Sequence, residues 1–212
     1  MTDSLDSPIE LSVRLQQQDE TALAELISIH RDRLWRMVNF RIDRRLQSRL
    51  WPDDVLQEAY LAAQKRLHRF SEDGFTSPFI WLRLIVHQTL IDLHRHYLGT
   101  QKRDVDREIS LDGKRFTQTT SASMMFQLVG DWTTPSQTAV RQERLDMVEQ
   151  AITGLEPLDR EVLALRHFEE LTNAEVAEEL GISGKAASIR YVRALKRLKD
   201  VISQFPGLIE HE

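Results

Sequence analysis

Cysteine is absent from the 212 residues of the chain, which excludes disulfide frameworks, cysteine-based zinc sites and cysteine nucleophiles. No apolar run approaches the roughly 18 residues that a membrane-spanning helix requires. The N-terminal segment MTDSLDSPIE carries acidic residues in place of the basic start of a secretion signal. We therefore expect a soluble protein that is not exported and that works in the cytoplasm.

Sequence motifs for catalysis and metal binding are also missing. The chain has no glycine-rich phosphate loop, HExxH, GxSxG or paired-carboxylate constellation. His87, His94 and His96 invite a metal-site interpretation, but His94 and His96 lie two residues apart and so point to different faces of a helix. We expect no enzymatic activity, no metal and no cofactor.

Glycine and proline are scarce, at 8 and 6 residues, and hydrophobic residues make up 41% of the chain. Over long stretches the apolar residues recur at positions i, i+3, i+4 and i+7, the spacing of an amphipathic helix, and no stretch shows the sustained alternation of a strand. A chain of this length suffices for one medium domain or two small ones. The pattern predicts an all-α protein.

The first half of the chain is predicted to form a helical bundle at residues 9–98. Asp19 suits the N-cap of a long helix, and Pro52 has the position of a first-turn proline. Ser77 followed by Pro78 supplies a cap and a first turn further along. The predicted helices are residues 9–15, 20–42, 52–70 and 78–98.

A change in composition separates this bundle from a second domain. Residues 99–136 are rich in Ser, Thr and Asp, and their scattered hydrophobic residues form no single face, which predicts a flexible linker. Helical spacing resumes at residue 137, and the second domain is predicted to extend to residue 205. Its four predicted helices are residues 137–152, 157–168, 173–180 and 184–203.

The last two of these helices form a predicted helix-turn-helix. Thr172 and Glu175 make the capping box T-x-x-E, Gly181 ends the short helix, and Ser183 caps the last one. The inward face of the last helix is expected to hold Ala187, Tyr191, Leu195 and Leu198. Its outward face is expected to hold Lys185, Ser188, Ile189, Val192, Arg193 and Lys196.

The last helix is strongly basic within an acidic chain. The formal net charge is -5, yet residues 185–199 contain six basic residues and no acidic one. Such a local excess of positive charge is typical of a helix that contacts DNA phosphates. A basic helix face can also be merely solvated. Agreement between the cap, the glycine turn, the inward apolar set and the outward basic face favours DNA binding.

The residues LEPLDREVLALRHFEELTNAEVAEELGISGKAASIRYVRALKRLK resemble region 4 of the sigma-70 family, the bacterial RNA polymerase initiation factors, and specifically the extracytoplasmic-function (ECF) type. PDDVLQEAYLAAQKRLHRF and FTSPFIWLRLIVHQTLIDLHR are similar to region 2 of the same family. Two blocks in the family's order carry more weight than a lone helix-turn-helix. The resemblance implies a sigma factor that binds core RNA polymerase and directs promoter-specific initiation by recognising the -10 and -35 DNA elements.

By this resemblance the bundle docks on the clamp of the largest polymerase subunit and captures the melted -10 strand. The implied polymerase contacts are Asp53, Asp54, Gln57, Glu58 and Leu61. Polar residues around one leucine suit a docking face, although charged helix faces are often only solvated. The implied -10 contacts are Phe75, Arg83, His87, Gln88 and Arg95. Trp81 is expected in the core, because it lies near the buried side of its helix.

The last helix is implied to enter the major groove of the -35 element. The implied DNA contacts are Lys185, Ser188, Ile189, Arg190, Val192, Arg193 and Lys196. The resemblance also implies contact with the flap of the second-largest polymerase subunit and no membrane insertion. Factors of this kind are often held by an anti-sigma protein, which the sequence does not identify.

The sequence departs from the family pattern in three places. His87 and Gln88 stand where the family usually has Arg-Asn, and Gln64 replaces an aromatic residue. Residues 184–190, GKAASIR, keep only the final Arg of the usual recognition run. Because apolar side chains recognise the thymine methyl group, Ile189 indicates an altered -35 sequence with a thymine contact.

Two other functions remain open at this point. One is a transcription regulator that uses the same helix-turn-helix and an N-terminal effector or dimerisation bundle. The other is a protein-interaction adaptor. An effector bundle should show a ligand pocket or a self-complementary apolar face, whereas a sigma factor should bind core polymerase and have weak duplex affinity alone.

Overall fold

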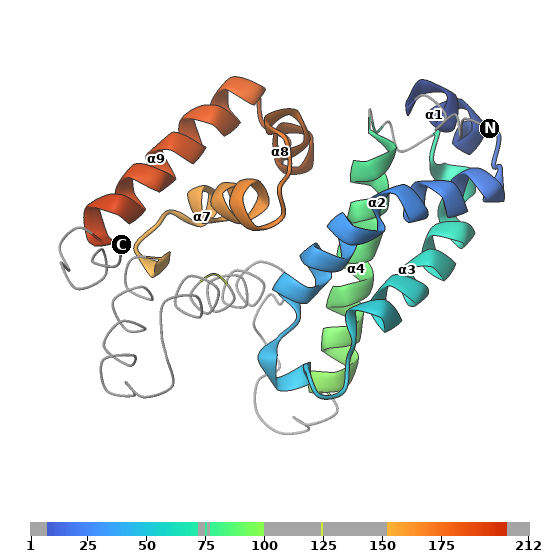
Figure 1. The fold of residues 1–212 in the computed structure, drawn as a ribbon, viewed down its shortest axis with the longest axis horizontal. Coiled ribbons are helices and arrows are strands. Elements are labelled where there is room, and N and C mark those ends of the chain that lie inside the picture. Colours follow the sequence, from blue (N-terminus) through green and yellow to red (C-terminus); the bar gives the residue numbers. More distant parts are fainter. Residues whose placement is uncertain (1–7, 72–74, 76, 100–123, 125–151, 203–212) are drawn as a thin grey trace, which may run out of the picture. The chain divides into compact units, whose positions relative to one another are not determined.

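The computed structural model describes residues 8–71, 75, 77–99, 124 and 152–202 (Figure 1). Across these residues every regular element is a helix, so the predicted all-α class is confirmed. The chain divides into two compact units, residues 1–105 and 106–212. The predicted linker lies outside the described residues apart from Gly99 and Met124, and the predicted helix at 137–152 lies outside them apart from Ile152.

The first unit contains a bundle of long helices (Figure 1). Helices α2, α3 and α4 pack against one another, and the short α1 packs on α2. Single 3-10 turns follow α2, at Arg44–Leu46, and α3, at Leu67–Arg69. The helices are α1 (Pro8–Gln16), α2 (Glu20–Arg41), α3 (Pro52–Arg66) and α4 (Pro78–Gly99).

Side-chain caps explain where these helices begin. The Asp19 carboxylate accepts the Thr21 N–H at 2.8 Å and the Thr21 hydroxyl at 2.6 Å, as the N-cap prediction requires. Hydrogen bonds from the Thr21 side chain and from Arg14 lower the pKa of Asp19 to about 2. Pro52 occupies the first turn of α3, and Ser77 Oγ accepts the Ile80 N–H at 3.4 Å.

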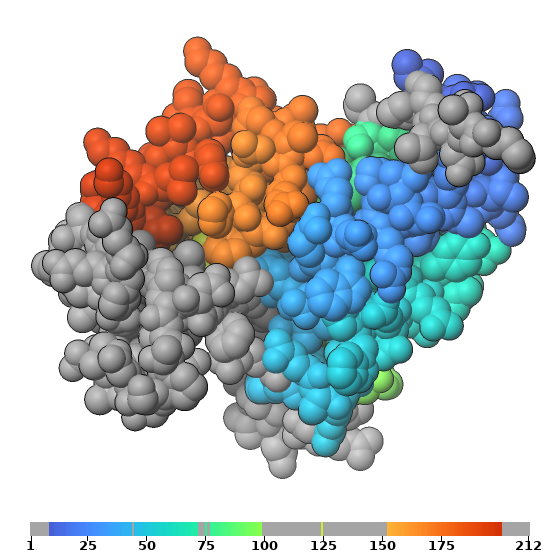
Figure 2. Space-filling model, viewed as in Figure 1, coloured from blue at the N-terminus to red at the C-terminus, as the bar shows by residue number. Residues whose placement is uncertain are grey.

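The core of the first unit is aliphatic and aromatic, with two buried cations among its side chains. Trp81 is 1% exposed and meets Phe70 edge to face at 5.1 Å between ring centroids, which confirms its predicted place in the core. Arg41 and Arg83 are 0% and 1% exposed. In the space-filling view, the atoms of α2 and α3 form one continuous surface on the face seen (Figure 2).

The second unit consists, in its described part, of α7 (Pro157–Leu163), the π-helical turn η3 (Ala164–Phe168), α8 (Asn173–Leu180) and α9 (Gly184–Ile202). Helix α9 packs against both α7 and α8. The predicted helix at 157–168 is therefore present, although its last turn is π-helical. The helix-turn-helix is formed by α8 and α9.

Both ends of α8 and the start of α9 are built as their sequence predicts. Thr172 Oγ1 accepts the Glu175 N–H at 3.2 Å, and the Glu175 carboxylate accepts the Thr172 N–H at 2.7 Å. Gly181 has a φ of +62°, a left-handed conformation that glycine adopts without steric cost. Ser183 Oγ accepts the Ala186 N–H at 3.2 Å. The start of α9 is thus fixed by side-chain and backbone chemistry.

The inward face of α9 agrees with its prediction at Ala187 and Leu198, whereas Tyr191 is half-buried and Leu195 is exposed. Ala187, Ala194 and Leu198 are buried, whereas Leu195 is 37% exposed. Residues 187, 194 and 198 follow the spacing i, i+7, i+11, which keeps one face of a helix. Leu195 lies about 100° further round the helix, so its assignment to the inward face was wrong.

Candidate DNA-binding and polymerase-binding surfaces

One face of α9 carries two lysines and two aliphatic residues, all exposed. Lys185, Ile189, Val192 and Lys196 are spaced by four, three and four residues and therefore lie in a row along the helix. Ile189 is 55% exposed and Val192 is 64% exposed. We call these four residues the outer stripe of α9. It lies opposite the buried face of Ala187, Ala194 and Leu198, and Ser188 is exposed beside it.

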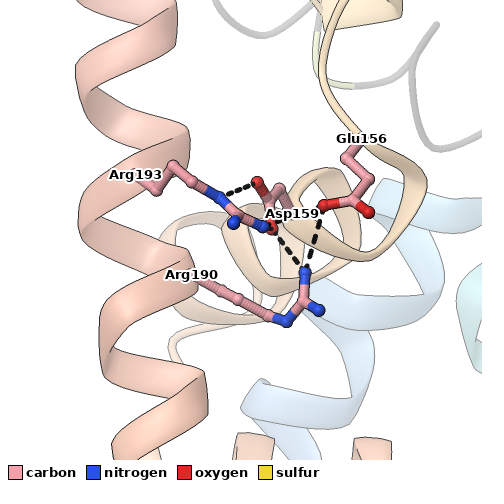
Figure 3. A network of polar contacts seen from close by, with 4 residues as sticks. All are labelled: Glu156, Asp159, Arg190 and Arg193. Atoms are coloured by element: carbon pink, nitrogen blue, oxygen red, sulfur yellow. Dashed lines mark hydrogen bonds and ion pairs between the residues drawn. The ribbon is translucent and has the colours of Figure 1, made fainter.

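Arg190 and Arg193 turn away from the outer stripe toward α7 (Figure 3). Arg193 Nε and Nη2 each donate to an oxygen of Asp159 at 2.6 Å. Arg190 Nη1 donates to Asp159 Oδ1 at 2.8 Å. Glu156 accepts from Arg193 at 2.8 Å and from Arg190 at 3.3 Å. Two of the predicted DNA contacts are therefore also the residues that join α9 to α7.

Asp159 is the centre of this network, and its side chain is 0% exposed. Burial acts to raise the pKa of the Asp159 carboxyl, but the hydrogen bonds from Arg193 and Arg190 outweigh burial and lower it. The same contact with Asp159 raises the pKa of Arg193. The carboxylate is therefore ionised, and it fixes two successive turns of α9 against α7.

This network was not predicted, although the sequence contains a signal for it. Glu156 and Asp159 are three residues apart, as are Arg190 and Arg193, so each pair lies on one face of its helix. Acids and bases in matching pairs indicate an ion-pair network only if α7 and α9 are known to face each other. That packing comes from the structure.

The predicted polymerase-binding residues lie together at the N-terminal half of α3. Asp54, Gln57, Glu58 and Leu61 are all exposed, and Leu61 is 44% exposed. Their spacing of three, one and three residues places them on one helix face. We call Asp54, Gln57, Glu58 and Leu61 the α3 face.

The two acids at the start of α3 also have partners within the bundle. Asp53 pairs with Arg31 of α2 at 2.5 Å and accepts the indole N–H of Trp35 at 3.4 Å. The Asp54 carboxylate accepts the Trp51 N–H at 3.4 Å as part of the helix cap. Glu58 lies one turn further on, away from the cap. Reversal of charge at Glu58 therefore leaves the start of α3 intact.

The predicted -10 contacts are only partly on the surface. Arg83 lies inside the bundle at 1% exposed, which corrects its assignment as a DNA contact, because a buried side chain offers DNA no surface. Gln88 is half-buried and donates to Asp92 at 3.1 Å. Arg95 is exposed and pairs with Asp92 at 3.5 Å. Phe75 is half-buried, and most of the predicted base-holding loop around it lies outside the described residues.

His87 stands beside the two buried arginines of the bundle. Burial, followed by the charges of Arg41 and Arg83, lowers the pKa of His87 well below its usual range. A neutral imidazole is therefore the stable form at neutral pH. The two buried arginines explain why His87 departs from the family pattern, because an arginine at this position would place a third cation beside Arg41 and Arg83 in the interior. Gln64, another departure, donates to Glu20 at 3.0 Å and ties α3 to the start of α2.

None of the described helices has the length and apolar character to cross a membrane. In the same part of the chain no group of three or more His, Cys, Asp or Glu residues is arranged to hold a metal ion.

The two helical units and the exposed basic stripe of a helix-turn-helix define a two-domain DNA-binding protein. Comparison with known families then identifies it more closely. The model of Sigma-70 region 2 matches residues 26–98, and the model of Sigma-70, region 4 matches residues 145–198. Together the two matches cover more than half of the chain. The chain belongs to the sigma-70 family and is a sigma factor of the ECF type, which binds core RNA polymerase and directs initiation at promoter DNA.

Curated relatives extend the match over nearly the whole chain. The ECF RNA polymerase sigma factor SigW of Bacillus subtilis is 25% identical over 88% of this chain and 91% of its own length. The ECF RNA polymerase sigma factor SigD of Mycobacterium tuberculosis is 27% identical over 87% of this chain and 78% of its own. The fold resembles CnrH, solved in complex with the cytosolic domain of CnrY, with a TM-score of 0.51 and 22% identity over 94% of this chain and 99% of that one.

Proposed function

We propose that the two units divide the work of the sigma factor between them. The first unit binds the clamp of the largest polymerase subunit through the α3 face and Asp53, and it holds the melted -10 strand. The second unit lays α9 in the major groove of the -35 element and contacts the flap of the second-largest subunit. The observation that carries the proposal is the exposed α3 face, because the cap and the core of the bundle leave Gln57, Glu58 and Leu61 with no evident role in the fold.

The chemistry of the α3 face fits a basic protein partner. Glu58 and Asp54 supply carboxylates that arginines bind with short, charge-assisted hydrogen bonds. Leu61 supplies an exposed apolar group beside them, and interface energy concentrates where an apolar anchor is surrounded by polar contacts. We expect Glu58 and Leu61 to contribute most, since Asp53 and Asp54 already serve the bundle.

The -10 contacts are proposed for the exposed and half-buried residues of α4 and of the segment before it. Arg95 is positioned to attract the strand's phosphates, and Gln88, His87 and Phe75 provide polar and aromatic groups for an unstacked base. Arg83 acts from inside the bundle, by holding α4 in place. This arrangement separates electrostatic attraction at the end of α4 from base contact in its middle.

The -35 contacts are proposed for the outer stripe of α9. Lys185 and Lys196 bind phosphates, and Ser188, Ile189 and Val192 meet base edges. Arg193, at 43% exposed, reaches phosphate from within its network with Asp159. Arg190, at 26% exposed, chiefly positions the helix.

The proposal also covers catalysis, cellular location and regulation. The chain performs no catalysis of its own, since the chemistry of transcription belongs to the polymerase. It acts in the cytoplasm, where its polymerase partner works. It is restrained by an anti-sigma protein, in line with the bound state in which CnrH was solved.

The test is binding of the full chain to bacterial core RNA polymerase, with Glu58→Arg as the perturbation. Like charges brought together at an interface cost more than about 1.4 kcal/mol, which is tenfold in Kd. We expect Glu58→Arg to weaken binding at least about tenfold. Glu10→Arg, an equal reversal at an exposed position of α1, should bind as the unchanged protein does.

Equal binding by Glu58→Arg and Glu10→Arg would contradict the proposal, because it would remove the α3 face from the interface.

A further inference from the structure

Ile189 and Val192 are unusual residues for the most exposed face of a charged helix. They are 55% and 64% exposed, and residues 185–199 contain six basic residues and no acidic one. The buried face of α9 is complete without them. Apolar side chains kept on the surface in one patch often mark a binding site, so the pair calls for a partner.

The direction in which this pair points is fixed by the fold. Asp159 binds Arg190 and Arg193 on one side of α9, while Ala187 and Ala194 are buried against the rest of the unit. These contacts prevent α9 from rotating about its own axis. The outer stripe therefore always faces outward, and Ile189 and Val192 arrive together at whatever α9 binds.

The charges around the pair identify DNA as the partner, in preference to an apolar protein surface. Lys185 and Lys196 flank the two aliphatic residues along the same stripe, about 16 Å apart at 1.5 Å per residue. A protein partner would need anions on both sides of a small apolar centre. DNA has both features, because phosphates line the major groove and the only methyl group on its floor belongs to thymine.

We propose that Ile189 and Val192 recognise the methyl groups of two thymines in the -35 element, and this proposal rests on the proposed function. Their Cα atoms are about 4.5 Å apart along the helix axis, for three residues. Successive base pairs rise by about 3.4 Å. A spacing of this size suits thymines in neighbouring base pairs, on the same strand or on opposite strands.

The experiment replaces thymine by deoxyuridine, which removes the methyl group and nothing else. A -35 duplex is first selected from a random library by the full chain bound to core RNA polymerase, and each thymine is then replaced in turn. Burial of one methyl group corresponds to about fourfold in Kd. We expect two neighbouring replacements to weaken binding about fourfold each.

The variants assign each methyl group to a side chain. Ile189→Ala should abolish the effect of one replacement, and Val192→Ala that of the other. Alanine favours the helix, so α9 remains formed. Ile29→Ala, at an exposed isoleucine of α2, should keep both effects. Lys196→Ala should weaken both duplexes alike and reduce the dependence of log Kd on log salt by about 0.9.

The outcomes separate this inference from the proposed function. Specific binding in which Ile189→Ala and Val192→Ala remain as sensitive to deoxyuridine as the unchanged chain would overturn the inference alone. Failure to select any duplex, even though the chain binds core polymerase, would overturn the -35 role of α9 and this inference with it.

Discussion

Replacement of Asp159 by asparagine tests how α9 is held. The substitution keeps the shape of the side chain but removes the buried charge that accepts three hydrogen bonds from Arg190 and Arg193. Loss of one partner from a fully buried ion pair costs about 3 to 5 kcal/mol. The two arginines are 26% and 43% exposed, so water compensates part of the loss. We expect the second unit to lose about 2 to 3 kcal/mol of unfolding free energy.

Urea unfolding of the full chain can assign this loss to one unit. Tryptophans occur at positions 35, 51, 81 and 132, and the first three belong to the first unit. In a Trp132→Phe background, tryptophan fluorescence follows the first unit, whereas far-UV circular dichroism follows both. Asp159→Asn should lower the midpoint of a circular dichroism transition and leave the fluorescence transition unchanged.

Glu156→Gln provides the matched control. Glu156 binds the same two arginines, but its side chain is 53% exposed, and exposed ion pairs contribute about 0 to 1 kcal/mol. A loss of unfolding free energy in Asp159→Asn that is no greater than the loss in Glu156→Gln would contradict the role of the buried charge.

The contribution of Asp159 also depends on pH. The pKa of Asp159 is lowered from its ordinary value of 3.8, so the unfolded chain takes up the proton first. The difference in unfolding free energy between the unchanged chain and Asp159→Asn therefore has its full size above about pH 4, and it is lost as the pH falls through the folded-state pKa of Asp159.

Two further predictions concern stability in each unit. Burial, followed by the charges of Arg41 and Arg83, lowers the pKa of His87 well below its ordinary value of 6.5 in the fold, so the unfolded chain takes up the proton first and the first unit loses stability as the pH falls through about 6.5. His87→Gln should flatten that pH dependence in urea titrations, and an unchanged dependence would refute the assignment. Gly181→Ala should destabilise the second unit by about 1 kcal/mol, because residue 181 has a φ of +62°. The added methyl group would meet no other atom, so backbone strain alone causes the loss. Gly181→Asn should lose less stability, and an alanine variant as stable as the unchanged chain would contradict the strain argument.

Local chemistry explains why so much of the fold could be predicted from the sequence. Asp19, Ser77, Thr172 and Gly181 each mark a helix end by an interaction within a few residues, and the structure confirms all four. Such signals need no knowledge of tertiary packing. Helix spacing also identified the α3 face, because residues on one face of a helix are related by a fixed repeat.

The errors share a different cause, which is dependence on distant partners. Arg83 was assigned to DNA by the resemblance to region 2, yet it is 1% exposed inside the bundle. Leu195 was assigned to the inward face of α9, yet it is 37% exposed and Ala194 is buried instead. In both cases the helix was predicted correctly and its rotation was not, since rotation depends on which neighbours pack against it.

The same dependence changes the meaning of the charge on α9. Sequence counting assigns six basic residues to positions 185–199, and each would add to the salt dependence of DNA binding if it met a phosphate. Arg190 and Arg193 already meet Asp159 and Glu156, so phosphates gain less from them than from the lysines. The positive charge of α9 that lies outside the Asp159 network is therefore carried by the exposed Lys185, Lys196, Arg197 and Lys199, two of which flank Ile189 and Val192 on the outer stripe. Under the proposed -35 role, the stripe lysines supply affinity and Ile189 and Val192 supply specificity, while the buried carboxylate of Asp159 keeps the outer stripe turned outward.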